Sequence, residues 1–388
     1  MAAVPATHPV IGEEAVRELC HIIRNGNLAQ GQVVEALEAA FASHVGTRYA
    51  VALSSGTAAL HLALLAHGIG AGDGVITSPL CLPAVGTAIL ATGATPVYAD
   101  INPYTYTISP LEADRAAQHV TRNAQLANSR CALLAIHLFG QPCDMAALAG
   151  IAQRYGLVLI EVAWEALGAQ HDGVRVGSFG TTCYSFQQGM SIATGEGGML
   201  TTEDKEVATA VRRMANYGCD RGGRVQGPGF NYRMTDVTAA LAQAQLPLVD
   251  AHVELQRYWA SELAYGLTGF PGLIPPAVLP GAAHAFLRYA VRITPKFPLR
   301  PEEVRRSLHD QGIEAALCHL LPLHQHPFYS SLCGPVQSLC QAERVAQELL
   351  FLPMHPYLEE PDVERMTHAL RLMATCVPAG KYEPDSEE

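Results

Sequence analysis

The sequence contains very little lysine. Only Lys205, Lys296 and Lys381 occur among its 388 residues, and the other basic residues are arginines. Because 36 acidic residues outnumber 25 basic ones, the formal net charge is −11. Such a chain lacks the basic surface to which nucleic acids and anionic membranes bind, so we expect neither as a partner. Any reaction that needs a lysine amine must use one of the three positions.

Other features are also missing. The first twenty residues lack a basic start followed by an unbroken apolar core, and no apolar run is long enough to span a bilayer. The ten cysteines include no C-x-x-C pair. These absences predict a cytoplasmic protein with reduced, mostly buried thiols.

Helix-like and strand-like segments alternate from about Gln32 to Thr201. Short apolar runs predict strands, and apolar residues at helical spacing predict the helices between them. We expect strands at residues 49–53, 75–77, 96–98, 132–138 and 157–160, and helices at 58–66 and 145–155. This alternation predicts an α/β fold with a mixed, mainly parallel sheet that is covered on both faces. A ligand site is expected at the carboxyl ends of its strands.

The last third of the chain has a different pattern. A long helical pattern from Thr235 to Leu263 contains Pro247, which predicts a break. A strand is expected at residues 289–293 and a helix at 301–311. We therefore divide the chain into a large domain, residues 1–250, and a smaller C-terminal α/β domain, residues 251–388. Residues 382–388 are polar and acidic, which is typical of a solvated tail.

The segment 54–60 stands between a predicted strand and a predicted helix. Gly56 allows a ligand to approach the backbone, Thr57 adds a hydroxyl, and the free N–H groups at a helix start favour an anion such as phosphate. Ser and Thr are also common as helix caps, so the segment alone fits either role.

Two further segments are rich in glycine or in polar residues. Residues 178–200 contain Gly180, Gly189, Gly195, Gly197 and Gly198, which predicts tight turns and close backbone contacts. Residues 229–236 end at Thr235 and Asp236, either of which is suited to cap the following helix.

Together the three segments resemble one family. Their order and spacing are similar to those of the fold-type I, pyridoxal-phosphate-dependent sugar aminotransferases of the DegT/DnrJ/StrS group, and most similar to enzymes that aminate scyllo-inosose-type cyclitols. Residues 27–31, 137–142 and 352–356 extend the resemblance over nearly the whole chain. The resemblance implies a fold-type I aminotransferase architecture, a dimer with shared sites, and a role in aminocyclitol, sugar or other secondary metabolism.

The resemblance also identifies positions at which this chain differs. The family's cofactor-binding lysine aligns with Met190, and the aspartate that pairs with the pyridine nitrogen aligns with Val162. The aromatic residue that stacks on the cofactor aligns with Leu82. Glu165 replaces a glutamine near the ring hydroxyl, and Trp164 replaces a small residue. Because methionine has no amine, we expect no covalently bound cofactor.

The positions that hold the phosphate are unchanged. They are Gly56, Thr57 and Ser185, together with Asn231, which the family contributes from a neighbouring subunit. Non-covalent binding of pyridoxal phosphate or pyridoxamine phosphate is therefore not excluded. A homodimer is expected, with a heterodimer with an active, lysine-bearing paralogue as the alternative.

Several side chains are candidates for chemistry without the cofactor. Glu165 is a candidate acid or base with a pKa raised by Trp164, or else a salt-bridged carboxylate. Cys81 is a candidate nucleophile, although such cysteines are more often buried apolar residues. Tyr184, Gln187 and Ser185 are candidates to orient a polyol.

Histidines also fall into two groups. His137 lies in a strand-like run and is best interpreted as a core histidine. His319, His324 and His326 are close in sequence, but their spacing matches no standard zinc pattern, so we predict no metal site. The resemblance implies substrate contact for His324.

Three hypotheses follow. The one that we favour is a PLP-independent enzyme on an aminotransferase scaffold, in which Glu165 catalyses dehydration, isomerisation, epimerisation or cyclisation of a sugar-like metabolite. The second is a non-catalytic partner subunit of an active paralogue. The third is a protein that binds a sugar phosphate or a nucleotide sugar. Ordinary PLP-dependent transamination is the option that we favour least.

Overall fold

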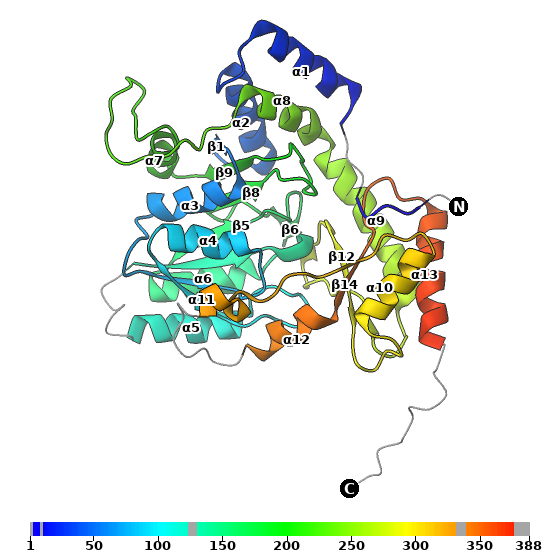
Figure 1. Ribbon diagram of the computed structural model, residues 1–388. Helices are drawn as coiled ribbons and strands as arrows, with labels where there is room; N and C mark the ends of the chain where they lie inside the picture. The colour runs from blue at the N-terminus through cyan, green and yellow to red at the C-terminus, as the bar shows by residue number, and fades with distance from the viewer. Residues whose placement is uncertain (1–2, 8–10, 123–129, 331–338, 376–388) are drawn as a thin grey trace.

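A seven-stranded sheet forms the centre of the larger part of the molecule (Figure 1). The computed structural model describes residues 3–7, 11–122, 130–330 and 339–375. The strand order is β1-β9-β8-β5-β4-β2-β3. The strands are β1 (Tyr49–Leu53), β2 (Gly74–Thr77), β3 (Thr95–Tyr98), β4 (Cys131–Ile136), β5 (Val158–Val162), β8 (Thr181–Ser185) and β9 (Gly198–Thr202). Only β9 is antiparallel to its neighbours, which confirms the predicted mixed, mainly parallel sheet.

Helices cover both faces of this sheet. Successive side chains of the central strands point to opposite faces, and both sets are buried under helices. In β4, Ala132 and Leu134 pack into one core cluster, whereas Leu133 and Ala135 pack into another. The first face carries α3 (Gly56–Ala66), α4 (Pro83–Ala91) and α7 (Lys205–Ala215). The second face carries α2 (Gln32–Val45), α5 (Pro110–Arg122), α6 (Met145–Tyr155) and α8 (Asp236–Gln245).

The predicted break at Pro247 is present. It separates α8 from α9 (Val249–Leu267) by a single 3₁₀ turn, η2 (Leu246–Leu248). Of the two candidate caps, Thr235 is the one that caps α8, by accepting the N–H of Thr238. Asp236 instead accepts the N–H groups of Gly31 and Val34, and so fixes the start of α2.

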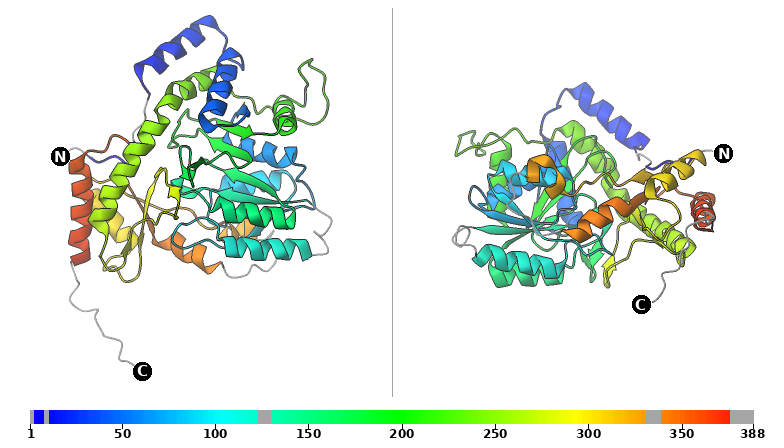
Figure 2. Two further views of the ribbon diagram at one scale, coloured as in Figure 1. Left: turned by 180° about the vertical axis from the view of Figure 1, so that it is seen from behind. Right: turned by 60° about the horizontal axis from the view of Figure 1, so that its bottom comes forward.

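A second sheet lies in the C-terminal part of the chain. Its antiparallel strands have the order β10-β12-β14-β13, and α9, α10 and α13 pack with it (Figures 1 and 2). The elements are β10 (Leu273–Ile274), β12 (Tyr289–Ile293), α10 (Pro301–Asp310), β13 (Ala316–Leu317), η3 (Leu323–Gln325), α11 (Pro327–Ser330), α12 (Cys340–Glu348), β14 (Leu349–Leu352) and α13 (Glu360–Thr375). A small third sheet contains β6 (Gln170–His171), β7 (Val174–Arg175) and β11 (Ala282–Ala283).

The N-terminal segment reaches both parts of the molecule. Val4 pairs with Ile313 and packs into the core of the C-terminal sheet, whereas α1 (Glu13–Asn25) lies against α8 (Figure 1). The predicted domain boundary, between residues 250 and 251, falls inside α9. Since α9 packs into the core beside the large sheet through Val253 and into the second core through Leu263, this division stays a prediction. The predicted tail, residues 382–388, lies outside the described residues.

No helix within the described ranges is long and apolar enough to cross a membrane.

Candidate active site

Three loops meet at one edge of the large sheet. The strands β1, β5 and β8 run in the same direction, so their carboxyl ends lie at this edge. Gly56 begins α3 shortly after β1, Trp164 follows β5, and Ser185 is the last residue of β8. A ligand site was predicted at the carboxyl ends of parallel strands, and residues from three separate segments lie close together there.

Gly56 contacts the other two loops directly. A Cβ atom added to Gly56 would lie 2.7 Å from Cβ of Ser185 and 3.0 Å from Nε1 of Trp164. Gly198 allows a similar approach, because a Cβ atom there would lie 2.4 Å from the carbonyl carbon of Ser55. Both positions need glycine for close packing. We refer to Gly56, Thr57 and Ser185 as the anion cup.

The helix start in this cup has free donors. Ser55 is the N-cap of α3: its Oγ accepts the N–H of Ala58 at 3.0 Å, and its carbonyl accepts that of Ala59. The first N–H groups of a helix have no partner within the helix, so those of Gly56 and Thr57 are available to an anion. The sequence left cap and cup as alternatives; the structure shows that Ser55 is the cap, and the cup stays a prediction.

Apolar side chains line the site beside the cup. Cys81, Val162 and Trp164 are buried in one core cluster, and Leu82 packs against it. Three positions that the resemblance placed around a cofactor ring, Leu82, Val162 and Trp164, therefore belong to the same apolar core region as Cys81. Burial raises the pKa of the Cys81 thiol well above its usual range, so the nucleophilic thiolate is not available, and its role is packing.

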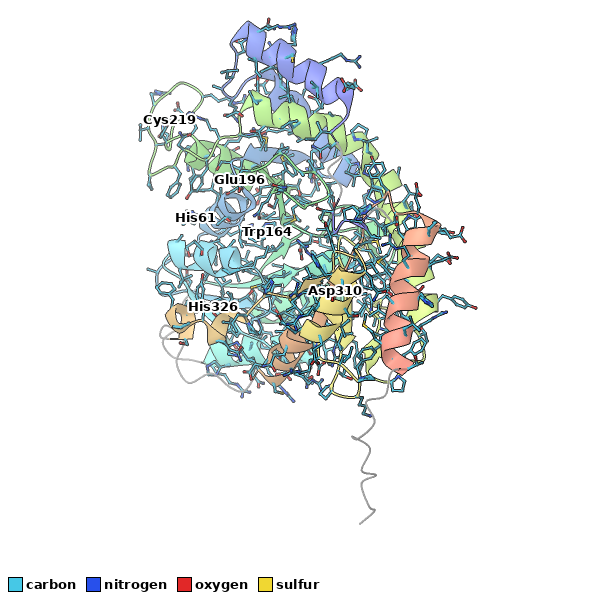
Figure 3. All side chains as sticks on the ribbon, turned by 45° about the vertical axis from the view of Figure 1, so that its right-hand side comes forward. His61, Trp164, Glu196, Cys219, Asp310 and His326 are labelled. Carbon is cyan, nitrogen blue, oxygen red and sulfur yellow. The ribbon has the colours of Figure 1, made fainter. Side chains whose placement is uncertain are left out.

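Trp164 is buried, with 6% of its surface exposed. Its Nε1 is inaccessible to solvent and has no hydrogen-bond partner among the described residues. Figure 3 shows Trp164 within the part of the molecule that carries the large sheet. The indole N–H is an unfilled donor beside the anion cup.

Glu165 does not face the site as a free acid or base. Its Oε2 accepts the backbone N–H of Phe139 at 2.9 Å, and its Oε1 accepts Nε–H of Arg288 at 3.0 Å. Both oxygens of the buried carboxylate are thus engaged, as in a structural ion pair. The sequence suggested this role as the alternative to acid/base chemistry.

Tyr184 was predicted to line the pocket, and this prediction is wrong. Its ring packs between the sheet and α2, where it meets Phe41 edge to face with centroids 5.0 Å apart. Its hydroxyl donates to the carbonyl of Val176. Because β8 alternates, Cys183 packs on the face that carries Trp164, whereas Tyr184 packs on the other.

Met190 lies in a loop after β8 and lines a different pocket. This pocket has a volume of about 100 Å³ and lies between the loop, α9 and the segment 354–356. Its lining includes Gln188, His252 and His355. Gln187, by contrast, is exposed. The sequence had placed Met190 beside the cofactor ring; the described residues that line its pocket do not include Gly56, Trp164 or Ser185.

The remaining candidates lie elsewhere. The Nε2 atom of His324 is 2.8 Å from Glu343 Oε1 of α12, so an ion pair or hydrogen bond occupies that nitrogen. Asn231 is exposed on the segment before α8. His137 is a core histidine, as predicted: it contacts Glu161 at 3.2 Å and accepts the N–H of Cys143.

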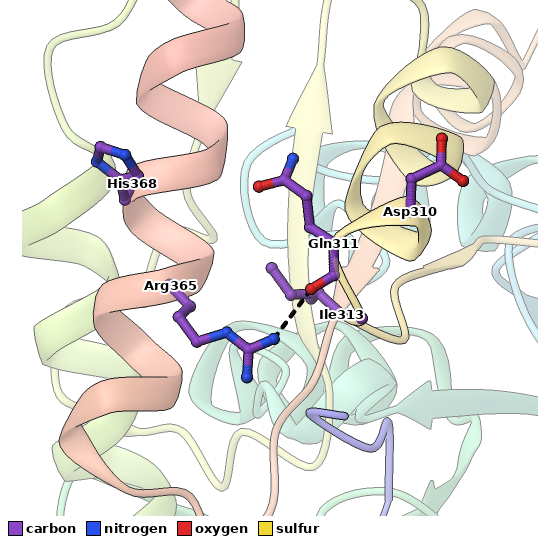
Figure 4. Close-up of a pocket in the computed structure, with 6 residues that line it drawn as sticks. Asp310, Gln311, Ile313, Arg365 and His368 are labelled. Carbon is purple, nitrogen blue, oxygen red and sulfur yellow. Dashed lines mark hydrogen bonds between the residues drawn. The ribbon is translucent and has the colours of Figure 1, made fainter. Parts of the chain in front are cut away.

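A larger surface pocket lies in the C-terminal part. Its volume is about 450 Å³, and it lies between the end of α10 and α13 (Figure 4). Arg365 donates across it to the carbonyl of Gln311 at 2.9 Å. It contains none of the residues that the sequence singled out for function. Among the described residues, no cluster of three or more His, Cys, Asp or Glu side chains is arranged to hold a metal ion.

The mixed, mainly parallel sheet with a smaller C-terminal sheet is an α/β fold of the aminotransferase type. The chain belongs to the DegT/DnrJ/EryC1/StrS aminotransferase family, whose profile matches residues 9–371.

Relatives match over nearly the full length. The chain is 34% identical to spore coat polysaccharide biosynthesis protein SpsC of Bacillus subtilis, over 95% of this chain and 96% of the relative. It is 33% identical to dTDP-3-amino-3,4,6-trideoxy-alpha-D-glucose transaminase of Streptomyces venezuelae, over 96% and 95%. The crystal structure of S. venezuelae DesV in complex with a ketimine intermediate superimposes with a TM-score of 0.90 and 32% identity, over 97% of this chain and 100% of DesV.

These relatives correct the favoured hypothesis. PLP-independent acid/base chemistry, of the lyase or isomerase type, is wrong as the function of this chain, because relatives that match it over more than nine tenths of its length are named as a sugar transaminase and a sugar aminotransferase. The environment of Glu165 gives a physical reason, since both its oxygens are already bound. The protein is an enzyme of the aminotransferase family.

Sequence reasoning missed two parts of this arrangement. Arg288 had no motif that could identify it as the partner of Glu165, which lies 123 residues earlier. The pocket around Met190 depends on His252 and His355 from distant segments. By contrast, Gly198 was within reach, because the glycine-rich segment 178–200 indicated close backbone contacts.

Proposed function

We propose that this protein is a sugar aminotransferase that transfers an amino group to a ketone-bearing sugar, nucleotide sugar or cyclitol. The observation that carries the proposal is the anion cup at the start of α3, with its free N–H groups and the unfilled donor of Trp164 beside it. Relatives named for amino transfer to sugars support it, among them the dTDP-3-amino-3,4,6-trideoxy-alpha-D-glucose transaminase of Streptomyces venezuelae, at 33% identity.

The residues of the cup fit the phosphate of a pyridoxal cofactor. Helix N–H groups, the Ser185 hydroxyl and an unpaired indole N–H are donors, and a phosphate ester offers only acceptors. When bound, pyridoxal phosphate or pyridoxamine phosphate supplies the carbonyl or amine through which an amino group passes from donor to acceptor.

Neither of the two lysines among the described residues, Lys205 and Lys296, is available at the cup for a covalent bond. Met190 stands where the resemblance places that lysine, and Lys205 is exposed at the start of α7, beyond the opposite end of β9 from Gly198. Lys296 is exposed in the C-terminal part. In our proposal the cofactor is therefore held by hydrogen bonds and packing alone.

The chain's own residues would bind and shield the cofactor. Gly56 and Thr57 would bind its phosphate through their N–H groups, and Ser185 through its hydroxyl. Leu82 and Val162 supply apolar surface that excludes water from the ring, which strengthens polar interactions inside the site.

A second copy of the chain is part of the proposal. Asn231 is exposed, and so are Tyr217 and Val225 on the preceding loop, at 50% and 70%. These side chains are suited to a homodimer in which Asn231 reaches the partner's site, and a heterodimer with a lysine-bearing paralogue is the competing arrangement. Cytoplasmic location remains a prediction.

The experiment is an amine-transfer assay with purified protein. It contains L-glutamate, pyridoxal phosphate and a nucleotide-linked keto sugar, and mass spectrometry detects the amino sugar. We expect cofactor-dependent formation of the amino sugar by the homodimer. Failure with a panel of keto sugars and cyclitol ketones, by protein that binds the cofactor, would overturn the proposal. Product formed only after addition of a lysine-bearing relative would identify the heterodimer instead.

A further inference from the structure

Trp164 has a polar atom that the fold leaves unused. Its residue is 6% exposed, and its Nε1 is buried without a hydrogen-bond partner among the described residues. A buried donor that lacks an acceptor costs about 1–3 kcal/mol. A ligand that supplies an acceptor would recover this free energy on binding.

The indole N–H is also next to the start of a helix. Nε1 lies 3.0 Å from the Cβ position of Gly56, the first residue of α3. This helix has 11 residues, and its Ser55 cap satisfies the N–H of Ala58, which leaves the first N–H groups for a ligand. The partial positive charge of the helix start and the indole N–H therefore lie next to each other.

We propose that Trp164 is a ligand-binding residue whose indole N–H donates to a phosphate oxygen of the cofactor, and so helps to retain it without a covalent bond. This inference rests on the proposed function. It assigns a hydrogen-bonding role to Trp164, for which the sequence indicated only the replacement of a small residue and an effect on Glu165.

Trp259 provides a matched control. It is the only other tryptophan of the chain, and its Nε1 is also buried without a partner among the described residues. It packs against the core of the C-terminal sheet and meets Tyr258 edge to face. It therefore shares the unpaired N–H of Trp164 but not the helix start.

The experiment compares Trp164→Phe with Trp259→Phe. Phenylalanine keeps an aromatic ring and removes the N–H. Equilibrium dialysis measures the affinity of the full-length dimer for pyridoxamine phosphate, pyridoxamine, inorganic phosphate and uridine diphosphate. We expect Trp164→Phe to weaken pyridoxamine phosphate about tenfold, which is about 1.4 kcal/mol, and Trp259→Phe to leave it unchanged.

Pyridoxamine separates the hydrogen bond from packing. A packing defect would weaken pyridoxamine and pyridoxamine phosphate alike, whereas loss of a donor to the phosphate weakens only the ester. Tryptophan fluorescence gives a second readout. The cofactor should quench the emission of Trp259→Phe, in which Trp164 is the only tryptophan, and should not quench that of Trp164→Phe.

Three results would overturn the inference. Equal affinity of Trp164→Phe and native protein for pyridoxamine phosphate would remove Trp164 from binding and leave the proposed function intact. Equal weakening of ester and free amine would assign Trp164 to packing. Uridine diphosphate binding that depends on Trp164, without any binding of either cofactor form by native protein, would overturn both this inference and the proposed function.

Discussion

Glu165 and Arg288 join the two parts of the molecule. Glu165 follows β5 at the edge of the large sheet, and Arg288 precedes β12 of the C-terminal sheet; their side chains meet at 3.0 Å. The same carboxylate accepts the N–H of Phe139, a residue with a φ of 60°. Glu165 therefore fixes a strained turn and the position of the second sheet beside the active site.

Replacement of Glu165 by Gln should lower stability rather than abolish turnover. Glutamine keeps one acceptor but loses the charge that Arg288 pairs with. Since the Arg288 side chain is 33% exposed, solvent offsets part of this loss, and we expect a decrease of about 1–3 kcal/mol in the free energy of unfolding, measured in urea. Amine transfer should fall less than tenfold.

Glu203→Gln is the control, because the pair between Glu203 and Arg48 is exposed. It should leave the urea midpoint unchanged. If the Glu165→Gln protein has native stability but no turnover, Glu165 is a catalytic residue and this prediction is wrong.

Local patterns predicted elements well where they are short and bounded. The strands at 49–53 and 289–293 and the helix at 145–155 occur as expected. For a buried strand, the face of the sheet to which each side chain points was not predictable in the same way. Both faces of β8 are covered by apolar layers, so the periodicity that identifies a solvent-facing side is absent, and Tyr184 was assigned to the wrong face.

Contacts between distant segments were also beyond local pattern. The Glu165–Arg288 pair depends on how the C-terminal sheet packs against the large one. Resemblance nevertheless grouped Gly56 and Ser185, which the structure places close together, because each lies in a short motif at the end of a strand.

Met190→Lys tests the alignment that places the family's cofactor lysine at position 190, although the pocket that Met190 lines in this structure does not include Gly56, Trp164 or Ser185. Position 190 is half-buried in the loop that follows β8, so a lysine there is partly shielded from water. This shielding lowers the pKa of the lysine amine and makes the amine more nucleophilic. After addition of pyridoxal phosphate and reduction with borohydride, peptide mass spectrometry should find near-stoichiometric modification at position 190. The native protein should carry no reduced adduct at Lys205 or Lys296.

Gln188→Lys controls for a lysine elsewhere in the same loop, because Gln188 is exposed. Its modification should be at least tenfold lower at limiting cofactor. Equal modification of both variants would show that position 190 does not face the cofactor, and a reduced adduct in the native protein would refute non-covalent binding.

Cys81 should not react in the folded protein. Complete burial raises the pKa of its thiol, so the thiolate needed for alkylation is absent at pH 8. Cys20 and Cys340 are exposed and should be alkylated by iodoacetamide within the same time. Peptide mass spectrometry with and without urea measures the difference. Rapid labelling of Cys81 in the native state would contradict its assignment to packing.

His284 should make stability depend on pH. Burial, together with the nearby charge of Arg257, lowers its pKa to about 3, and its Nδ1 accepts the N–H of Phe286 at 2.7 Å. In the unfolded chain its pKa is about 6.5. Above that pH the residue has no effect. Below it only the unfolded chain takes up the proton, so stability should fall by about 2 kcal/mol at pH 5.

His284→Asn keeps an acceptor but cannot titrate. The difference in unfolding free energy between this variant and the native protein isolates His284 from the other histidines, and it should change by about 2 kcal/mol between pH 7 and pH 5. A difference that is constant over this range would show that His284 is protonated in both states or in neither.

Gly56→Ala should close the anion cup. The added methyl would lie 2.7 Å from Cβ of Ser185 and 3.0 Å from Nε1 of Trp164, so the three loops must separate by several tenths of an ångström. We expect a loss of about 1–3 kcal/mol in stability and at least a tenfold loss in affinity for pyridoxamine phosphate.

Gly150→Ala in α6 is the control, because nothing lies within 4 Å of its Cβ position. That variant should gain about 0.5–1 kcal/mol and bind normally. Native affinity in folded Gly56→Ala protein would place the phosphate away from α3.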